Sequence, residues 1–297
     1  MKTILGTAPD SWGVWFPHDS KQILWSRYLD EVAEAGYSWT ELGPFGYLPT
    51  DPMQLEDELS ARELSLCGGT IGGALTSREA VQVLGGQLVE LASLLLHSEV
   101  ARTIVLLPES YSDMRTGKQI MSKEASTAQW RQMVDAMHRF GDLAGERGFQ
   151  LLFHPHADSW VETEDQIARF LDDTDPDLVG LCFDTGHHAY CGGDAVAFFH
   201  GYHQRIPYLH LKSIDPLVLK ASRREHLGFA QAVARGVMCE PSAGSIDFAA
   251  FRDVLTGVGF EGFAIVEQDM YPVAVDRPLP IAQRTRAYLV ELGFGDG

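Results

Sequence analysis

The chain of 297 residues is long enough for one large α/β domain, and its 45% hydrophobic and 22% charged residues are ordinary for a globular protein. No apolar run approaches the roughly 20 residues that span a bilayer, which argues against a membrane protein. The formal net charge of -18 opposes the phosphate contacts on which nucleic-acid binding depends, so we expect no nucleic acid as a partner.

Along the chain, short apolar runs alternate with stretches whose apolar residues recur at helical spacing. Eight runs are predicted to be strands: Thr3–Thr7, Trp39–Gly43, Leu64–Gly68, Thr103–Leu107, Phe149–His154, Leu178–Asp184, Tyr208–Lys212 and Phe263–Glu267. The clearest helical patterns between them are Gln22–Ala35, Ala80–His97, Thr127–Glu146 and Glu164–Leu171. Eight alternating units predict an α/β fold, a (β/α)8 TIM barrel that forms a single domain over residues 1–297. An open, doubly wound sheet is the alternative.

One connection is longer than the others. Residues 213–246, after the seventh strand, contain several Gly, Pro and Arg residues and are predicted to form a long loop. A long segment after a barrel strand lies at the catalytic face, where lids and specificity loops occur. A plain surface insertion is the alternative reading.

The cysteines and the N-terminus indicate the compartment. Cys67, Cys182, Cys191 and Cys239 include no CxxC pair, which predicts reduced thiols rather than disulfides or a zinc site. Polar residues interrupt the apolar N-terminal run at once, so the chain does not begin like a signal peptide. We expect a cytoplasmic protein.

Four of the predicted strands end in residues that bind divalent metals. These residues are His154, Asp184, His210 and Glu267. Each alone is typical of a hydrogen-bonded structural residue, but parallel barrel strands all end on one face, so the four should converge. Imidazole with carboxylate suits transition metals better than Ca²⁺. The sequence therefore predicts a divalent metal site that favours Mn²⁺ or Co²⁺ and leaves Zn²⁺, Fe²⁺ and Mg²⁺ open.

Three more polar residues lie beside these strand ends. His156 and Lys212 each follow a predicted ligand by two residues and share its side of an extended chain. His187 lies one turn beyond Asp184 and could reach the metal or a substrate oxygen. Lys212 could steady an enolate or a hydroxyl, or form a salt bridge to a carboxylate at the rim.

The N-terminal half supplies predicted pocket walls. Trp12 and Trp15 follow the first strand and offer aromatic faces for a sugar or cyclitol ring, with loop packing as the alternative. Glu41 in the second strand and Thr70 after the third should face the same pocket. Glu41 could accept substrate hydroxyls or a proton.

With these residues named, the sequence resembles the xylose isomerase-like TIM-barrel superfamily, also called sugar phosphate isomerase/epimerase. Three segments carry the resemblance: Asp184-Thr185-Gly186-His187, His210-Leu211-Lys212 and Val266-Glu267-Gln268-Asp269. In its isomerases and epimerases the fifth strand ends in a metal-binding Glu, which pairs with the Glu of the eighth strand to move a proton. Here the fifth strand ends in His154-Pro155-His156, which is similar to the inosose dehydratase branch.

That branch implies a metal-dependent lyase of inositol and carbohydrate catabolism, which eliminates water from a keto-inositol through an enolate. The resemblance implies that Glu267, Lys212, His156 and Glu41 act in catalysis. The substrate, a small-molecule polyol or keto-sugar, would be bound by Trp12, Trp15, Glu41, Thr70, His187 and Lys212. Which residue is base and which is acid stays open, as does a homo-oligomeric state.

Other functions remain as alternatives. One is an isomerase or epimerase of a ketose or keto-inositol, and another is a β-eliminating lyase of an oxidised (3-keto) glycoside. A third is nucleic-acid repair by an endonuclease IV-like barrel, which the acidic charge disfavours. A non-catalytic binding barrel is the last.

Overall fold

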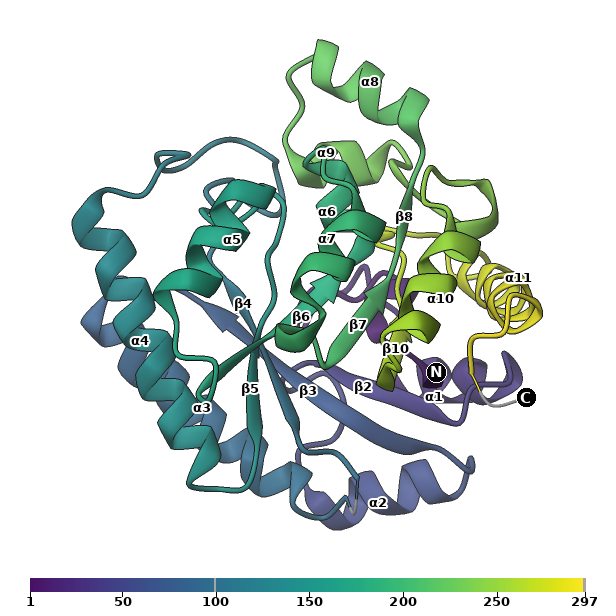
Figure 1. Ribbon diagram of the computed structural model, residues 1–297. Coiled ribbons are helices and arrows are strands. Elements are labelled where there is room, and N and C mark those ends of the chain that lie inside the picture. The colour runs from purple at the N-terminus through teal and green to yellow at the C-terminus, as the bar shows by residue number, and fades with distance from the viewer. Residues whose placement is uncertain (99, 296–297) are drawn as a thin grey trace.

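A closed barrel of parallel strands forms the centre of the computed structural model, which describes residues 1–98 and 100–295 (Figure 1). Its strands are β1 (Lys2–Thr7), β2 (Trp39–Pro44), β3 (Ser65–Gly73), β4 (Thr103–Pro108), β5 (Gln150–Phe153), β6 (Val179–Asp184), β7 (Tyr208–Leu211) and β10 (Glu261–Val266). The ring closes where β1 pairs with β10, from Lys2 opposite Glu261 to Thr7 opposite Val266. The predicted (β/α)8 barrel is therefore confirmed, and each of its strands overlaps a predicted one.

Helices follow the strands and surround the barrel. They are α1 (Trp25–Glu34), α2 (Pro52–Ser60), α3 (Arg78–Leu95), α4 (Thr127–Gly145), α5 (Glu164–Asp173), α6 (Thr185–Tyr190), α7 (Ala195–Tyr202), α10 (Phe248–Gly257) and α11 (Pro278–Glu291). Local signals set their ends. Asp51 caps α2 by accepting the N–H of Gln54, and Thr163 forms a capping box with Gln166 at the start of α5.

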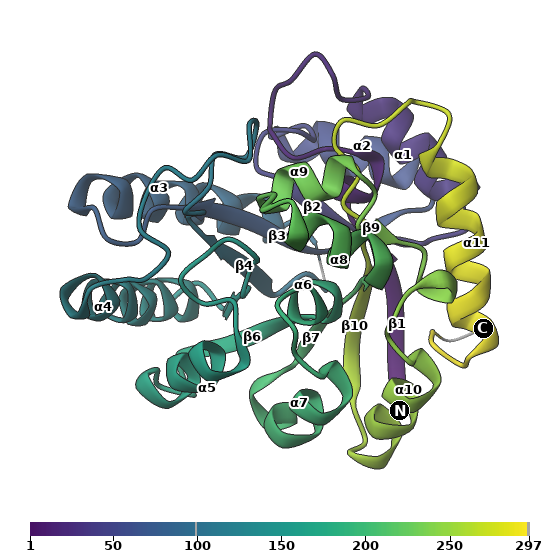
Figure 2. The ribbon, with the colours of Figure 1, turned by 90° about the horizontal axis from the view of Figure 1, so that it is seen from above.

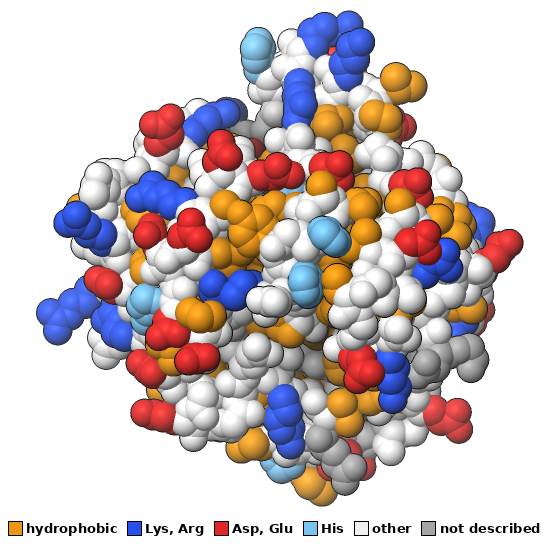
Figure 3. Space-filling view, viewed as in Figure 1, with side chains coloured by type: hydrophobic (Ala, Val, Ile, Leu, Met, Phe, Trp, Pro, Cys, Tyr) orange, Lys and Arg blue, Asp and Glu red, His pale blue; other side chains and the backbone are white. Residues whose placement is uncertain are grey.

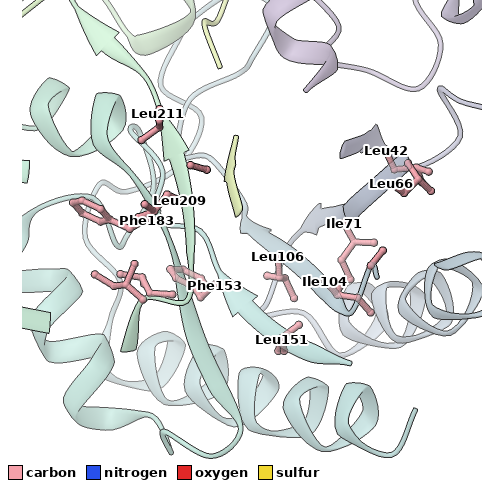
Figure 4. Packing of buried hydrophobic residues seen from close by; sticks show 14 of the residues in the cluster. Leu42, Leu66, Ile71, Ile104, Leu106, Leu151, Phe153, Phe183, Leu209 and Leu211 are labelled. Atoms are coloured by element: carbon pink, nitrogen blue, oxygen red, sulfur yellow. The ribbon is translucent and has the colours of Figure 1, made fainter. Parts of the chain in front are cut away.

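Alternating side chains along each strand separate the outer core from the barrel interior. Leu106 and Leu209 point outward and belong to the main hydrophobic cluster (Figure 4). Their neighbours Val105 and Tyr208 point inward and join a separate small cluster with Cys182. Side chains alternate along a strand with a period of two residues. The inward-pointing positions therefore continue to the strand ends, where their side chains face the barrel mouth.

The sequence predicted a long loop after β7, but this segment contains regular structure. It holds the short antiparallel pair β8 (Ser213–Ile214) and β9 (Met238–Cys239), with α8 (Pro216–Arg224) and α9 (Phe229–Ala234) between them. We call residues 213–247 the cap. Figures 1 and 2 show α8 and α9 beyond the carboxyl end of β7.

The two cap helices have different surroundings. Lys220 and Arg224 are exposed on α8, which forms the basic protrusion at the top of Figure 3. Phe229, Ala232 and Val233 of α9 are buried in a hydrophobic cluster of the cap. The outer helix therefore faces solvent, whereas the inner one packs toward the barrel.

Two further predictions concern the whole chain. The four cysteines are free, as predicted. Within residues 1–98 and 100–295, the longest helices are too polar or too short to cross a membrane.

Candidate metal centre and active site

The four predicted metal ligands converge at the carboxyl ends of their strands. His154 follows β5, Asp184 ends β6, His210 lies on β7 and Glu267 follows β10. Each side chain is buried and offers one ligand atom, and these atoms all lie within 4.8 Å of one another. His210 Nδ1 lies 2.9 Å from Glu267 Oε2 and 3.8 Å from Asp184 Oδ2. His154 Nε2 lies 3.6 Å from the same Asp184 oxygen.

Contacts behind two of these ligands fix which atom faces the centre. Asp184 caps α6, and its Oδ1 accepts the N–H of His187 at 2.8 Å. His210 donates from Nε2 to Glu41 Oε1 at 3.0 Å, because a carboxylate can only accept, so in the neutral ring that a metal requires Nδ1 would carry the lone pair. Asp184 Oδ2 and His210 Nδ1 are buried and make no regular hydrogen bond, and the ammonium of Lys212 lies 3.2 Å from that Asp184 oxygen. Two imidazoles and two carboxylates whose ligand atoms gather this closely form a donor set that fits a divalent metal.

Glu41 lies behind His210 and is held on both oxygens. Its Oε1 also accepts the hydroxyl of Tyr208 at 2.8 Å, and its Oε2 accepts the hydroxyl of Thr70 at 3.2 Å. The pairing of β2 with β3 shifts register on either side of Glu41, an irregularity that re-aims a side chain. Gly43 follows with a φ of +66°, and a Cβ there would lie 2.5 Å from the ring of Pro9. The Glu-Leu-Gly segment thus turns Glu41 toward the imidazole that it orients.

Lys212 is fully buried among four carboxylates. Its Nζ lies 2.8 Å from Asp269 Oδ2, 3.0 Å from Glu267 Oε2, 3.2 Å from Asp184 Oδ2 and 3.5 Å from Asp10 Oδ2. Burial acts to lower the pKa of Lys212, but these carboxylates together raise it well above its usual value. The ammonium form is therefore retained at the centre of the site.

The Asp-Thr-Gly-His segment makes room for this lysine. The hydroxyl of Thr185 donates to the carbonyl of Lys212 at 2.7 Å. A Cβ on Gly186 would lie 2.5 Å from Lys212 Cγ, so any side chain there would displace the lysine. The glycine of the motif thus serves the position of Lys212.

His156 and His187 form a pair of neutral imidazoles, with ring centroids 4.0 Å apart. His156 Nδ1 donates to the carbonyl of Ala157 at 2.7 Å, which leaves Nε2 as the basic nitrogen. Burial, and next to it the proximity of His154, lowers the pKa of His156 to about 3. Burial also holds the pKa of His187 well below its usual value, with its Nδ1 3.3 Å from the N–H of Ala157. Both rings stay uncharged at neutral pH.

A cavity of about 320 Å³ opens beside these groups. The predicted residues Trp15, Glu41 and Thr70 line it, together with Phe45 and Met114. Each predicted site residue except one therefore contributes to the cavity or to the ligand cluster at its base.

That exception is Trp12, which lies outside the cavity wall. Its side chain is fully buried and donates from Nε1 to Glu31 Oε2 on α1 at 2.8 Å. Trp12 ends the short 3-10 helix η1 (Pro9–Trp12), which turns it toward α1 while Trp15 faces the cavity. We do not include Trp12 in the substrate pocket.

Two carboxylates at the site were missed by the sequence analysis. Asp269 follows Glu267 by two residues, so the alternation that identified His156 and Lys212 could also have found it. Asp10 comes soon after β1, where barrel strands present active-site residues. Both line the cavity and contact Lys212.

Comparisons with known proteins agree with this fold. A family model described as Xylose isomerase-like TIM barrel matches residues 29–291. Inosose dehydratase of Geobacillus thermodenitrificans is 31% identical over 298 residues, which cover 98% of this chain and 97% of that protein.

Solved structures share the fold. The probable 3-DHS dehydratase AsbF from Bacillus anthracis has a TM-score of 0.72 at 14% identity, covering 98% of this chain and 99% of its own. The IOLI protein, whose structure holds a zinc atom, has a TM-score of 0.71 at 17% identity, covering 98% of each chain.

Proposed function

The chain belongs to the xylose isomerase-like TIM barrel family, and we propose that it is a divalent-metal-dependent hydro-lyase that removes water from a keto-inositol. The observation that carries this proposal is the placement of two unlike proton-transfer groups at one cavity, the imidazole of His156 and the ammonium of Lys212 held among carboxylates. Elimination of water needs one group that takes a proton and another that gives one. The inosose dehydratase relatives support the same reaction.

The proposed ligands of the metal are His154, Asp184, His210 and Glu267. A divalent ion bound there would polarise a substrate ketone and acidify the adjacent C–H bond. Glu41 would fix the tautomer of His210 from behind, as outer-shell carboxylates do for ligating imidazoles. Mn²⁺ or Co²⁺ suits this mixed nitrogen and oxygen set, although the donor types do not choose between them.

The two proton transfers fall to His156 and Lys212. His156 Nε2 takes the proton from the carbon next to the ketone, and the C–H electron pair forms the enolate. When the ketone re-forms, the C–O bond of the β-hydroxyl breaks. Lys212 donates a proton to the departing hydroxyl, which leaves as water. His156 then loses its proton and Lys212 regains one, so the enzyme ends as it began.

The cavity suits a compact, uncharged ring. Trp15 and Phe45 supply aromatic faces for the C–H face of a cyclitol, and Thr70 and His187 supply polar atoms for hydroxyls. Lys212 is already surrounded by carboxylates, so it offers little to an anionic substrate.

The reaction can be followed directly. Metal-loaded protein is mixed with 2-keto-myo-inositol and the dione product is monitored by ultraviolet absorbance, with Asp184→Ala as the metal-free control. Absence of product with the metal site intact would refute the proposal.

A second assay addresses the alternatives. Deuterium uptake from D₂O into recovered substrate or an epimer, without loss of water, would instead indicate an isomerase or epimerase. A 3-keto glycoside in the same assay tests the β-eliminating glycoside lyase.

A further inference from the structure

The cap reaches the active site through one aromatic side chain, Phe229 at the start of α9. Its ring is 1% exposed. The ring centroid lies 4.9 Å from that of His187 and 5.2 Å from that of His156, edge to face in the second case. Neither imidazole is a proposed metal ligand, so neither is held in place by the metal.

The same ring backs a wall of the cavity. Phe229 stacks on Trp15 at 6.3 Å with an interplanar angle of 14°, and Trp15 stacks in turn on Tyr271 at 5.1 Å. Trp15 also donates from Nε1 to Asp269 Oδ1 at 3.1 Å. One continuous aromatic column therefore runs from the cap to the loop after β10.

The backbone of the cap is fastened at this point. The N–H of Phe229 donates to Asp158 Oδ2 at 2.9 Å, in the loop after β5 that also carries His156. A Cβ on Gly228 would lie 2.4 Å from the carbonyl of Gly117, so the cap approaches the loop after β4 as closely as backbone allows. Phe229 thus meets the imidazoles from a fixed position.

We propose that Phe229 is a positioning residue that holds His156 and His187 in their working orientation. Among the described residues, one side-chain hydrogen bond, from Nδ1, holds the ring of His156, and a single bond leaves a ring free to swing about it. An edge-to-face contact with a rigid aromatic neighbour removes that freedom. The cap is then part of the catalytic apparatus, although none of its side chains reacts with substrate. The kinetic part of this inference rests on the proposed function.

The test compares two Phe→Leu variants of metal-loaded enzyme. Phe229→Leu removes the ring at the site. Phe251→Leu removes an equally buried ring on α10, in the main hydrophobic cluster away from the site. We expect Phe229→Leu to lower kcat by about 10- to 100-fold, as for a catalytic group misplaced by about 1 Å. Its Mn²⁺ affinity should match wild type, and Phe251→Leu should keep kcat.

A spectroscopic readout is independent of turnover. In protein labelled with ¹⁵N-histidine, the imidazole signals of His156 and His187 should shift in Phe229→Leu and stay in Phe251→Leu. In the wild type, the ring protons of Phe229 should show nuclear Overhauser contacts to both imidazoles. This measurement tests the contact of Phe229 with the histidines even if Phe229→Leu fails to fold.

Three outcomes would overturn the inference: no such contacts in the wild type, wild-type kcat in Phe229→Leu, or equal losses of kcat in both variants. If the wild type turns over no keto-inositol, the proposed function fails. The histidine signals then still test the positioning role.

Discussion

Replacing Glu41 should weaken metal binding although Glu41 is not one of the four proposed ligands. Glu41→Gln keeps the shape of the side chain. The amide oxygen can still accept from His210 and Tyr208, which share Oε1, and the amide nitrogen can donate to Thr70. Only the negative charge behind His210 is lost. Glu41→Ala removes the acceptor as well, so the tautomer of His210 is no longer fixed.

Loss of an outer-shell partner typically costs 10- to 100-fold in metal affinity, which is about 1.4 to 2.8 kcal/mol. Because Glu41→Gln keeps the hydrogen bonds, we expect the lower end, about tenfold. Glu41→Ala should reach the upper end, about 100-fold. Mn²⁺ titration by calorimetry, with free Mn²⁺ followed by electron paramagnetic resonance, measures both.

Glu109→Gln is the matched control. Glu109 follows β4, and its Oε1 accepts from Thr76 rather than from a histidine. The reasoning would be refuted if Glu41→Ala bound Mn²⁺ as tightly as wild type, or if Glu109→Gln lost as much affinity as Glu41→Gln.

The remaining predictions address the ligands and the proton-transfer groups. Asp184→Ala and Glu267→Ala should abolish Mn²⁺ uptake in elemental analysis; in thermal unfolding, Mn²⁺ at 100 times its Kd should stabilise the wild type by about 2.7 kcal/mol and leave both variants unchanged. His156→Gln should lower kcat by about 10²- to 10⁴-fold at unchanged metal affinity, and kcat within a factor of two of wild type would exclude His156 as the base. Gly186→Ala should displace Lys212 and destabilise the fold by about 1–3 kcal/mol in urea titrations; a folded variant with full activity would contradict the steric argument. Burial is the main cause that lowers the pKa of His156 to about 3, against roughly 6.5 in an unfolded chain. Between these values the unfolded state binds a proton that the folded state does not, so stability should fall as the pH drops from about 6.5 toward 3. In urea titrations across this range, His156→Gln should remove up to about 1.4 kcal/mol per pH unit from that slope, and an unchanged slope would count against the low pKa.

The convergence of the proposed metal ligands could be predicted from sequence because their positions follow from strand periodicity alone. Each lies at or near the carboxyl end of a strand, and parallel strands in a closed ring all present their carboxyl ends to one mouth. Asp184 and His210 therefore needed no knowledge of loop structure. Lys212 and His156 followed from the same argument, two residues further along.

The orientation of residues on loops and in the cap could not be predicted from strand periodicity. Trp12 and Trp15 look equivalent in sequence, but a 3-10 turn sends one toward α1 and the other toward the cavity. The role of Phe229 depends on how the cap packs on the barrel, which no local pattern encodes. Glu41 could be placed at the mouth but not behind His210, because its direction comes from an irregular strand pairing.

The pairing of β1 with β10 also makes the proposed metal site depend on closure of the ring. His154, Asp184 and His210 leave the ribosome well before Glu267, which reaches the centre only when β10 inserts between β1 and β7. Until then the sheet has two open edges, β1 and β7, which are prone to pair with other chains. A nascent chain thus lacks one of the four proposed ligands until β10 seats, and metal bound at this site would mark a completed ring.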